Sequence, residues 1–591
     1  MRIIQTIHSP QDIKKMSLDE LRELAVEIRY ALLSKLSIYG GHVASNLGIV
    51  EASIAMHYVF DSPNDKFVFD TSHQTYTHKI LTGRAKAFLD EAHYGDVTGY
   101  SSPEESPHDH FVIGHASTAI SLAMGLCKGR EVTGGNENVI AIIGDGSLSG
   151  GLAMEGLNCA GEYDGNLIIV VNDNQQSIQE NHGGIYKNLS LLRASNGNAQ
   201  NNWFEAQGLD YIYEENGNDV EALIRVFQRV KDTRKPVVVH IHSVKGKGYS
   251  PAELDPEEWH YTSPFNLGTG EKYKSRRKSY SEITAEFLVN EAQKRPELVV
   301  LAAGTCGVIG LTPSLREILG NQYVDSGIAE EHTIDLACGI AANGGIPVFG
   351  TLGTFFQRTY DQLMHDVALN HSSVILLLFG CGSYGLSDIT HTCLSDIAML
   401  SSIPGIDYLA PTCVEEYMDM LNWFVEHIRK YGGPVAIRIP GVNVTHRDVK
   451  WSVDYMRRNT FVVDREGKDI AIIAVGNMYD RAEIVAEELK NKGISPTLIN
   501  PRFVSGLDKN ILSSLYPNHK LVVTIEDGII EGGFGERVAG FYSHTAMRVL
   551  IKGFDKIVCA YEDVDSMLTQ SRMQVDQLVE DIMNVWNSLC K

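Results

Sequence analysis

The sequence predicts an α/β protein of three successive doubly wound domains with mostly parallel sheets. Helical segments alternate with short apolar runs along most of the 591 residues, which is typical of strands buried on both faces of a parallel sheet. The chain is too long for one hydrophobic core. A segment rich in proline, glycine and charge, from about 250 to 280, reads as a linker between two series of strands. We expect domains at residues 1–265 (with the linker), 275–445 and 460–591.

The first series runs from Ser17 to Gly248, with strands predicted at "FVFD", "VIAII", "LIIVV" and "PVVVHIH". Between the second and third of these strands, Ser149 to Glu162 is expected to form a helix. The second series runs from about Tyr280 to Pro440, with strands at "LVVLAAG", "IPVFGTL", "SVILLLFG" and "VAIRIPG". The third begins near Asp469, with strands at "DIAIIAVG", "SPTLINPRF", "KLVVTIEDG" and "MRVLIKG".

The composition limits the class of partner. A net charge of −23, from 51 Lys+Arg against 74 Asp+Glu, argues against nucleic acid or an anionic membrane as the main partner. No apolar run reaches the length of a membrane span, and the N-terminus lacks the apolar core of a signal peptide, so we expect a cytoplasmic protein. The nine cysteines show no Cys-x-x-Cys spacing, so neither a zinc site nor a disulfide framework is indicated, and we expect reduced, mostly buried thiols.

Polar turns follow two successive predicted strands in "VIAIIGDGSLSGGLAMEGLNCAGEYDGNLIIVVNDNQQSI". Both turns are expected at the carboxyl ends of neighbouring strands, where open α/β sheets bind ligands. Asp145 and Asn174 offer hard oxygen ligands suited to Mg²⁺, and Gly144 and Gly146 let the backbone approach a diphosphate. Alone, either tripeptide is more often an ordinary turn or loop. Together, with 25 residues between them, they match the thiamine-diphosphate motif.

Thiamine chemistry also needs a carboxyl group hydrogen-bonded to N1′ of the aminopyrimidine, in an apolar pocket that raises its pKa. In "GIAEEHTIDLACGIAANGG", Glu330 enters a helix of small and apolar residues, with Glu331 as its solvated neighbour. Phe355 follows a predicted strand in "GTLGTFFQRTYDQL" and is placed to stack on the aminopyrimidine. The simpler alternatives are a glutamate that stabilises a helix dipole and an ordinary core phenylalanine.

Several histidines follow glycines, small residues or turns near the ends of predicted strands. They are His42, His73, His78, His115, His260 and His391. A single histidine is more often structural, but a group of this kind favours a site that moves protons and binds oxyanions. None has the spacing of a helical metal-binding pair.

Together these motifs resemble the 1-deoxy-D-xylulose-5-phosphate synthase family, a branch of the transketolase-like thiamine-diphosphate enzymes. The resemblance runs nearly end to end and is carried by "GGHVASNLGIVEASIAMHYVFD", "SHQTYTHKILTGR", "GHAST", "KGKGYSPAELDPEEWH", "GIAEEHT", "TFFQRTYDQLMHDVAL", "THTCLSD" and "EDGIIEGGFGERV". It implies a transketolase-like fold and a homodimer. It also implies thiamine diphosphate and Mg²⁺ as cofactors, and pyruvate with an aldose or aldose phosphate as substrates.

By position, the resemblance assigns Mg²⁺ to Asp145, Asn174 and the carbonyl of Gln176. It assigns catalytic roles to Glu330, His42, His260 and His391. The residues that it places against the cofactor are His73, Gly114, His115, Ser117, Gly144, Asp145, Gly146, Asn174, Ile178, Lys245, Phe355 and Arg358.

The chain departs from the family where the acceptor phosphate is bound. The departures are Gly380 and Gly441 in place of arginines, Ser387 in place of aspartate and Leu352 in place of tyrosine. Arg358 is kept, and the segment after "NDNQQSIQEN" is shorter than in typical synthases. Each missing guanidinium group removes phosphate contacts of about 1.5–3 kcal/mol. We therefore expect weak binding of an acceptor phosphate unless another arginine, such as Arg438, binds it instead.

Three functions remain open from the sequence. The first is a decarboxylating synthase that joins pyruvate to a sugar aldehyde and forms a 1-deoxyketose. The second is a transketolase-type enzyme that moves a two-carbon ketol unit without decarboxylation. The third is an inactive homologue retained as a binding protein, and the presence of the metal ligands together with Glu330 and Phe355 argues against it.

Overall fold

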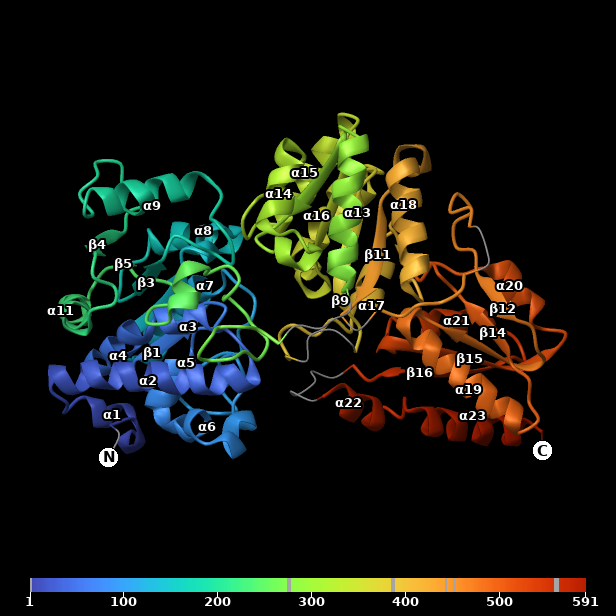
Figure 1. Ribbon diagram of the computed structural model, residues 1–591, viewed down its shortest axis with the longest axis horizontal. Coiled ribbons are helices and arrows are strands. Elements are labelled where there is room, and N and C mark those ends of the chain that lie inside the picture. Colours follow the sequence, from blue (N-terminus) through green and yellow to red (C-terminus); the bar gives the residue numbers. More distant parts are fainter. Residues whose placement is uncertain are drawn as a thin grey trace. The chain divides into compact units, whose positions relative to one another are not determined.

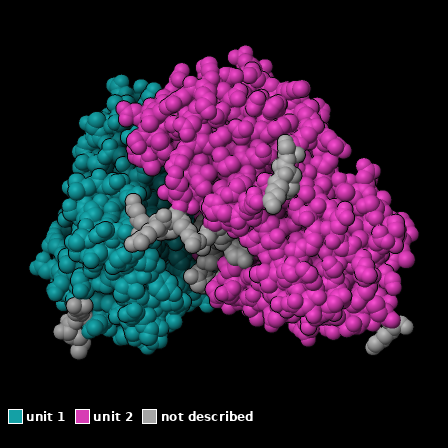
Figure 2. All heavy atoms as spheres, turned by 45° about the vertical axis from the view of Figure 1, so that its right-hand side comes forward, with its two compact units in different colours: residues 1–276, 326–329 teal, residues 277–325, 330–591 magenta. Residues whose placement is uncertain are grey.

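The structure, a computed structural model, describes residues 3–273, 278–383, 388–441, 444–449, 453–556 and 563–590. It contains three β-sheets flanked by helices, which confirms the predicted fold class (Figure 1). The chain forms two compact units, drawn in different colours in Figure 2. The first unit is Met1–Arg276 with Ser326–Ala329, and the second is Arg277–Asp325 with Glu330–Lys591.

The first sheet has the strand order β1-β2-β3-β5-β4, and all its strands are parallel. Its strands are β1 (Lys66–Phe69), β2 (Val139–Gly144), β3 (Ile168–Asp173), β4 (Asp210–Glu214) and β5 (Val237–His242). Alternate side chains enter two different cores. Ile140 and Ile142 pack with helices α2 (Leu18–Tyr39), α4 (Val50–Val59) and α11 (Val220–Val230). Ala141 and Ile143 pack with α7 (Ala119–Thr133) and α8 (Gly151–Ala160), so both faces of the sheet are covered.

The segment after β5, predicted as a linker, is instead folded onto the first unit as far as residue 273. It contains α12 (Ser250–Leu254), and Trp259 and Phe265 are 4% and 2% exposed in the first core. Thr262 exchanges backbone hydrogen bonds of 2.8 and 3.0 Å with Gly41. The linker prediction is wrong here because two aromatic side chains bury apolar surface within a polar stretch. Residues 274–277 of the predicted linker lie outside the described residues.

The second sheet has the order β10-β11-β9-β8-β6-β7, again all parallel. Its strands are β6 (Leu298–Ala302), β7 (Tyr323–Asp325), β8 (Ile346–Leu352), β9 (Ile375–Cys381), β10 (Asp407–Leu409) and β11 (Val435–Pro440). One face packs against α13 (Tyr280–Lys294) and α18 (Val414–Tyr431). The other face packs against α15 (Glu330–Ala342), whose first residue is the predicted catalytic glutamate.

The third sheet has the order β12-β14-β13-β15-β16, with β12 antiparallel to β14 and the other pairs parallel. Its strands are β12 (Val462–Arg465), β13 (Asp469–Ala474), β14 (Thr497–Asn500), β15 (His519–Ile529) and β16 (Arg548–Phe554). One face packs against α19 (Tyr479–Asn491), α22 (Val564–Gln570) and α23 (Val575–Leu589). On the other face, Ile473 and Val522 belong to the same buried cluster as Leu376 and Leu378 of β9, so the second and third sheets share a core.

The remaining helices include α21 (Phe534–Tyr542), which packs against strands β15 and β16 of the third sheet. The others are α1 (Pro10–Ile13), α3 (Ala44–Gly48), α5 (Tyr76–Lys79), α6 (Lys86–Leu89), α9 (Gly184–Ala194), α10 (Trp203–Ala206), α14 (Pro313–Leu319), α16 (Tyr360–Gln362), α17 (Asp396–Ser401) and α20 (Lys509–Ser514). Within the described part of the chain, no helix has the combination of length and apolar composition that a bilayer span requires.

Candidate active site

The two polar turns predicted to meet do lie together in the first unit. Strands β2 and β3 are neighbours, with Gly144 opposite Asn172, and the Asp145 backbone N–H donates to the Asn172 carbonyl at 3.2 Å. A Cβ added at Gly146 would lie 2.7 Å from Cβ of Ser177, so a glycine is needed for the turns to touch. A Cβ added at Gly144 would meet no atom within 4 Å. Gly144 thus leaves the open space that a diphosphate needs.

Two buried carboxylates stand at these turns in different electrostatic surroundings. Asp173 accepts hydrogen bonds from Arg193 and, at 2.9 Å, from His240. Burial raises the pKa of Asp173, but the hydrogen bonds and charges of His240 and Arg193 outweigh burial and leave the pKa below its usual value. Asp145 is 1% exposed and accepts a 2.7 Å hydrogen bond from the Asn181 amide. Burial and the Asp173 charge raise the pKa of Asp145 well above its usual range.

The surroundings of Asp145 fit a divalent cation. A buried carboxylate whose ionised form is disfavoured becomes stable when a cation neutralises it. The donor atoms nearby are hard oxygens, as Mg²⁺ prefers. Asn174 holds the next turn through its side-chain oxygen, which accepts from the Gln176 backbone N–H at 3.3 Å. The side-chain oxygen of Gln176 is buried and accepts no hydrogen bond from any described residue.

Lys245 and Ile178 complete the set of residues around these turns. The Lys245 ammonium donates to the Ser177 carbonyl, beside half-buried Ile178. Burial lowers the pKa of Lys245 to about 8, although the Asp145 carboxylate opposes this decrease. A lysine with this pKa is still largely charged at neutral pH, which suits an anionic ligand.

Three of the predicted histidines form one cluster in the first unit. The ring centroids of His42, His73 and His260 are 4.9 to 5.6 Å apart. The Asn46 amide donates to the backbone carbonyls of both His42 and His73 at 2.8 Å and so fixes the two turns that carry them. Burial and the charge of Lys245 lower the pKa of His260 well below its usual value, so this ring is neutral at pH 7. Neutral imidazoles can both donate and accept hydrogen bonds.

The Gly114–Ser117 segment lies against the turn after β2. The Ser117 hydroxyl donates to the Ser147 carbonyl at 2.8 Å, and its backbone N–H donates to Asp70 at the same distance. Ser117 has a φ of 75°, a left-handed conformation that is unusual for a residue other than glycine. Asp70 therefore holds a strained backbone beside the turn that carries Asp145, and His115 is half-buried in the same segment.

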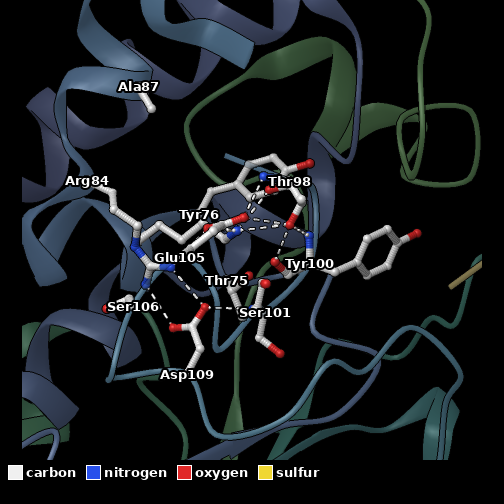
Figure 3. A network of polar contacts seen from close by, with 12 residues as sticks. Thr75, Tyr76, Arg84, Ala87, Thr98, Tyr100, Ser101, Glu105, Ser106 and Asp109 are labelled. Atoms are coloured by element: carbon white, nitrogen blue, oxygen red, sulfur yellow. Dashed lines mark hydrogen bonds and ion pairs between the residues drawn. The ribbon is translucent and has the colours of Figure 1, made fainter. Parts of the chain in front are cut away.

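His78 does not belong to this cluster. It is 1% exposed, and its ring contacts Asp109 at 2.9 Å and His57 at 2.8 Å. Figure 3 shows the surrounding ion pairs, in which Arg84 contacts both Glu105 and Asp109. The structure thus places His78 in the core, where Asp109 and His57 hold its ring, and not among the site histidines.

This network of ion pairs has a positioning effect. It anchors the segment from Thr98 to Asp109, in which Thr98 accepts and donates hydrogen bonds and Ser102 binds Asp109 at 2.8 Å. The same segment carries Tyr100, whose ring centroid is 5.8 Å from that of His42. Figure 3 shows the Tyr100 ring pointing away from the ion pairs. The network thus holds the segment that carries Tyr100 in place beside the histidine cluster.

The other four predicted site residues lie in the second unit, where Glu330 begins α15. Glu330 is 3% exposed, and its Oε2 makes no hydrogen bond to any described residue. Burial raises the pKa of Glu330 to about 7, although the Arg358 charge opposes the increase. A carboxyl group that exchanges its proton near neutral pH and keeps a free oxygen suits proton sharing with a ring nitrogen.

Phe355, Arg358 and His391 accompany Glu330 in the second unit. Phe355 and Arg358 belong to the 3₁₀ helix that follows β8 (Gly353–Thr359). The Phe355 and His391 rings are 5.6 Å apart in an edge-to-face arrangement. His391 Nδ1 is 2.8 Å from the Thr390 hydroxyl, and its side chain is 9% exposed. The structure therefore groups an aromatic ring, an imidazole and a guanidinium group with the buried glutamate.

The departures near the acceptor phosphate are partly described. Gly380 has a φ of 69°, so an arginine at this position would strain the backbone. Leu352 packs against it, since a Cβ added at Gly380 would lie 3.4 Å from Cδ2 of Leu352. Gly441 is exposed directly after β11. Ser387 lies outside the described residues.

Arg438 does not supply the missing phosphate contacts. Its guanidinium group is 2% exposed and donates at 2.6 Å to both Asp396 and Asp527. These two carboxylates raise the pKa of Arg438 even though burial opposes the increase. The suggestion that Arg438 replaces the missing arginines is therefore wrong, because the ion pairs occupy its donors.

Several residues that build this site are not predicted from the sequence. Asn46 and Asn181 stand in the quoted motifs without an expected role, and Tyr261 lies with its ring centroid 5.0 Å from His42. Asp70 accepts a hydrogen bond from the Ser117 backbone, and Arg193 pairs with Asp173. Both contacts join residues that are far apart in the sequence, so no local pattern reveals them.

Comparisons with known proteins find matching family models along the chain. The family model described as 1-deoxy-D-xylulose-5-phosphate synthase matches residues 4–201. Three transketolase models match as well: the thiamine diphosphate binding domain over residues 126–293, the pyrimidine binding domain over 276–445 and the C-terminal domain over 459–567.

Proteins named 1-deoxy-D-xylulose-5-phosphate synthase are similar along nearly the whole chain. The one from Syntrophomonas wolfei is 36% identical, with 99% of this chain and 97% of the relative covered. The one from Geobacter sulfurreducens is 38% identical, with 91% and 89% covered. A solved transketolase from Leishmania mexicana, with a TM-score of 0.45, is 16% identical and covers 97% of this chain and 98% of its own. On the identity to the curated relatives, the chain belongs to the 1-deoxy-D-xylulose-5-phosphate synthase family.

Proposed function

We propose that this enzyme condenses pyruvate, with loss of CO₂, with an aldose acceptor such as glyceraldehyde 3-phosphate. The product is 1-deoxy-D-xylulose 5-phosphate or a related 1-deoxyketose. The observation that carries the proposal is Glu330, a buried carboxyl group at the start of α15 whose pKa is raised to about 7. A helix-stabilising surface glutamate needs neither this burial nor this pKa.

The first unit supplies the residues that would hold the cofactor's charged end. Asp145, Asn174 and the Gln176 carbonyl would bind Mg²⁺, and Gly144 leaves space for the diphosphate. When bound, thiamine diphosphate supplies a nucleophilic carbon that adds to the keto group of the donor. Lys245, His73, His115 and Ser117 would line the diphosphate, while His42 and the neutral ring of His260 would hydrogen-bond the oxygens of the reacting carbons.

The second unit supplies the residues that would act on the aminopyrimidine and the acceptor. Glu330 would share a proton at N1′ through its free Oε2. The Phe355 ring would stack on the aminopyrimidine. His391 would face the substrate oxygens, and Arg358 would bind the acceptor phosphate and favour the ionised form of Glu330. The family resemblance further implies a homodimer, which light scattering on the purified protein tests.

A transketolase-type transfer of a two-carbon unit is the second candidate. The observation that favours it is the commitment of Arg438 to Asp396 and Asp527, which leaves the acceptor phosphate few cationic partners. Under this alternative, His260 and His391 would bind the hydroxyl groups of an unphosphorylated sugar.

One experiment separates the two candidates. The purified protein is supplied with thiamine diphosphate, Mg²⁺, pyruvate and, in turn, glyceraldehyde 3-phosphate or free aldoses. CO₂ release coupled to formation of a 1-deoxyketose supports the synthase. Ketol transfer from a sugar phosphate donor without CO₂ release supports the transferase. No turnover of any keto donor would contradict both candidates and favour a binding protein.

A further inference from the structure

Two buried cysteines meet next to the predicted catalytic residues of the second unit. Cys381 ends β9, and Cys393 lies two residues after His391. Their Sγ atoms are 3.9 Å apart, and the side chains are 0% and 2% exposed. The Gly382 backbone N–H donates to the Cys393 carbonyl at 2.8 Å, so an antiparallel bridge already holds the two segments together.

Both sulfur atoms also pack against the backbone that leads to Phe355. A Cβ added at Gly353 would lie 2.5 Å from Sγ of Cys381 and 2.7 Å from Sγ of Cys393. Gly353 begins the 3₁₀ helix that carries Phe355 and Arg358. Any covalent change at the sulfur pair is therefore transmitted directly to the segments that hold Phe355 and His391.

A metal ion fits this position poorly. Asp396 is the third group whose ligand atoms fall within 4.8 Å of the two sulfurs. Its carboxylate already accepts hydrogen bonds from Arg438 at 2.6 Å and from the Tyr408 hydroxyl at 2.5 Å. A guanidinium group in contact with a ligand repels a cation. Structural zinc also takes four ligands, and the described residues offer three here.

We propose that Cys381 and Cys393 form a reversible disulfide when the enzyme meets a small peroxide, and that this bond restrains the segments carrying His391 and Phe355. The expected loss of activity rests on the proposed function, whereas formation of the disulfide does not. A disulfide requires an S–S distance of about 2.05 Å, so side-chain rotation together with a small backbone adjustment must bring the sulfurs together.

The oxidation balances with one peroxide molecule. The first thiol sulfur attacks the peroxide O–O bond, forms a sulfenic acid and releases water. The second thiol sulfur attacks the sulfenic sulfur, the S–S bond forms, and the departing hydroxide takes the second thiol's proton as water. The neighbouring Cys381 thiol and burial raise the pKa of the Cys393 thiol well above its usual value, so little thiolate is present and the reaction is slow. Because both side chains are buried, only a small oxidant can reach them.

The test uses reduced holoenzyme treated with increasing hydrogen peroxide, followed by alkylation of free thiols and non-reducing peptide mapping. Exposed Cys159 serves as the internal reference for thiol oxidation. We expect a peptide pair linked through Cys381 and Cys393, a fall in turnover of about tenfold or more, and recovery of both with dithiothreitol. Cys393→Ser and Cys381→Ala should keep their turnover at the same dose. Cys413→Ser, which removes a buried thiol elsewhere, should respond as the wild type does.

Three results would overturn the proposal. The first is recovery of alkylated Cys381 and Cys393 at a dose that fully oxidises Cys159. The second is retention of one zinc equivalent by the wild type and its loss in Cys393→Ser. The third is a complete Cys381–Cys393 link with unchanged turnover, which would remove the restraint on His391 and Phe355. Mass spectrometry detects the disulfide independently of activity. If the protein showed no synthase turnover, the proposed function would be refuted, but the disulfide could still be tested.

Discussion

Replacing Glu330 with glutamine should impair catalysis and stabilise the protein. Glutamine cannot share a proton with N1′, so turnover should fall by about 10²-fold or more, the range seen for positioned acid–base groups. Burial raises the pKa of Glu330 from 4.5 to about 7. At about 1.4 kcal/mol per pH unit, ionising this group in the folded protein costs about 3 kcal/mol above pH 7.

The direction of the pH dependence follows from proton binding. Between pH 4.5 and about 7 the folded protein keeps the Glu330 proton and the unfolded chain does not, so the wild type loses stability as pH rises through this window. Below pH 4.5 both states are protonated and the loss disappears. Glu330→Gln removes the titrating group, so its stability should exceed that of the wild type at pH 8 and match it near pH 4.5.

Calorimetry of the cofactor-free protein measures this difference. With an unfolding entropy of about 2.1 cal/mol/K per residue and a second unit of about 300 residues, 3 kcal/mol corresponds to roughly 5 °C in Tm. Glu331→Gln is the matched control, because it changes the neighbouring carboxylate. An equal Tm shift of Glu330→Gln at both pH values, or turnover like that of the wild type, would refute the reasoning.

Three further predictions concern the metal and the acceptor. Asp145→Ala should lose most of the Mg²⁺-dependent binding of thiamine diphosphate in calorimetry, because the buried Asp145 carboxylate is the proposed metal ligand; undiminished binding in EDTA would refute the metal assignment. Gly441→Arg should lower the KM for glyceraldehyde 3-phosphate by about ten- to a hundredfold, the equivalent of 1.5–3 kcal/mol, and an unchanged KM would contradict this. Arg438→Met should destabilise the fold by about 3–5 kcal/mol because Asp396 and Asp527 lose their partner, whereas a raised KM at unchanged Tm would instead place Arg438 at the phosphate.

The sequence predicts the central strands well because burial on both faces demands continuous apolar runs. "VIAII" and "LIIVV" correspond to β2 and β3, and the parallel pairing follows from the helices between them. The sequence does not predict four strands: β4, β7, β10 and β12. Each lies at an edge of its sheet, and each is half-buried or only three residues long, so its apolar run is too short to detect.

The sequence predicts those parts of the site that depend on short motifs. It does not predict those that depend on contacts between residues far apart in the sequence. The paired turns of Asp145 and Asn174 follow from the strand order alone. The charge state of Asp145 depends on Asp173 being held ionised by Arg193 and His240, which no spacing shows. Arg438 is a second example. Its neighbours in the sequence do not reveal that its guanidinium group pairs with Asp396 and Asp527, so its commitment to these ion pairs could not be predicted.

The core shared by the second and third sheets limits how this enzyme can be cut or recombined. A truncation that removes the third sheet would take Ile473, Val522 and their neighbours out of the buried cluster that also contains Leu376 and Leu378, and so expose part of that cluster to water. Exposed apolar area of this kind favours aggregation over an autonomous fragment. We therefore expect a chimaera between relatives to fold only if it exchanges the whole second unit, so that the second and third sheets come from the same parent.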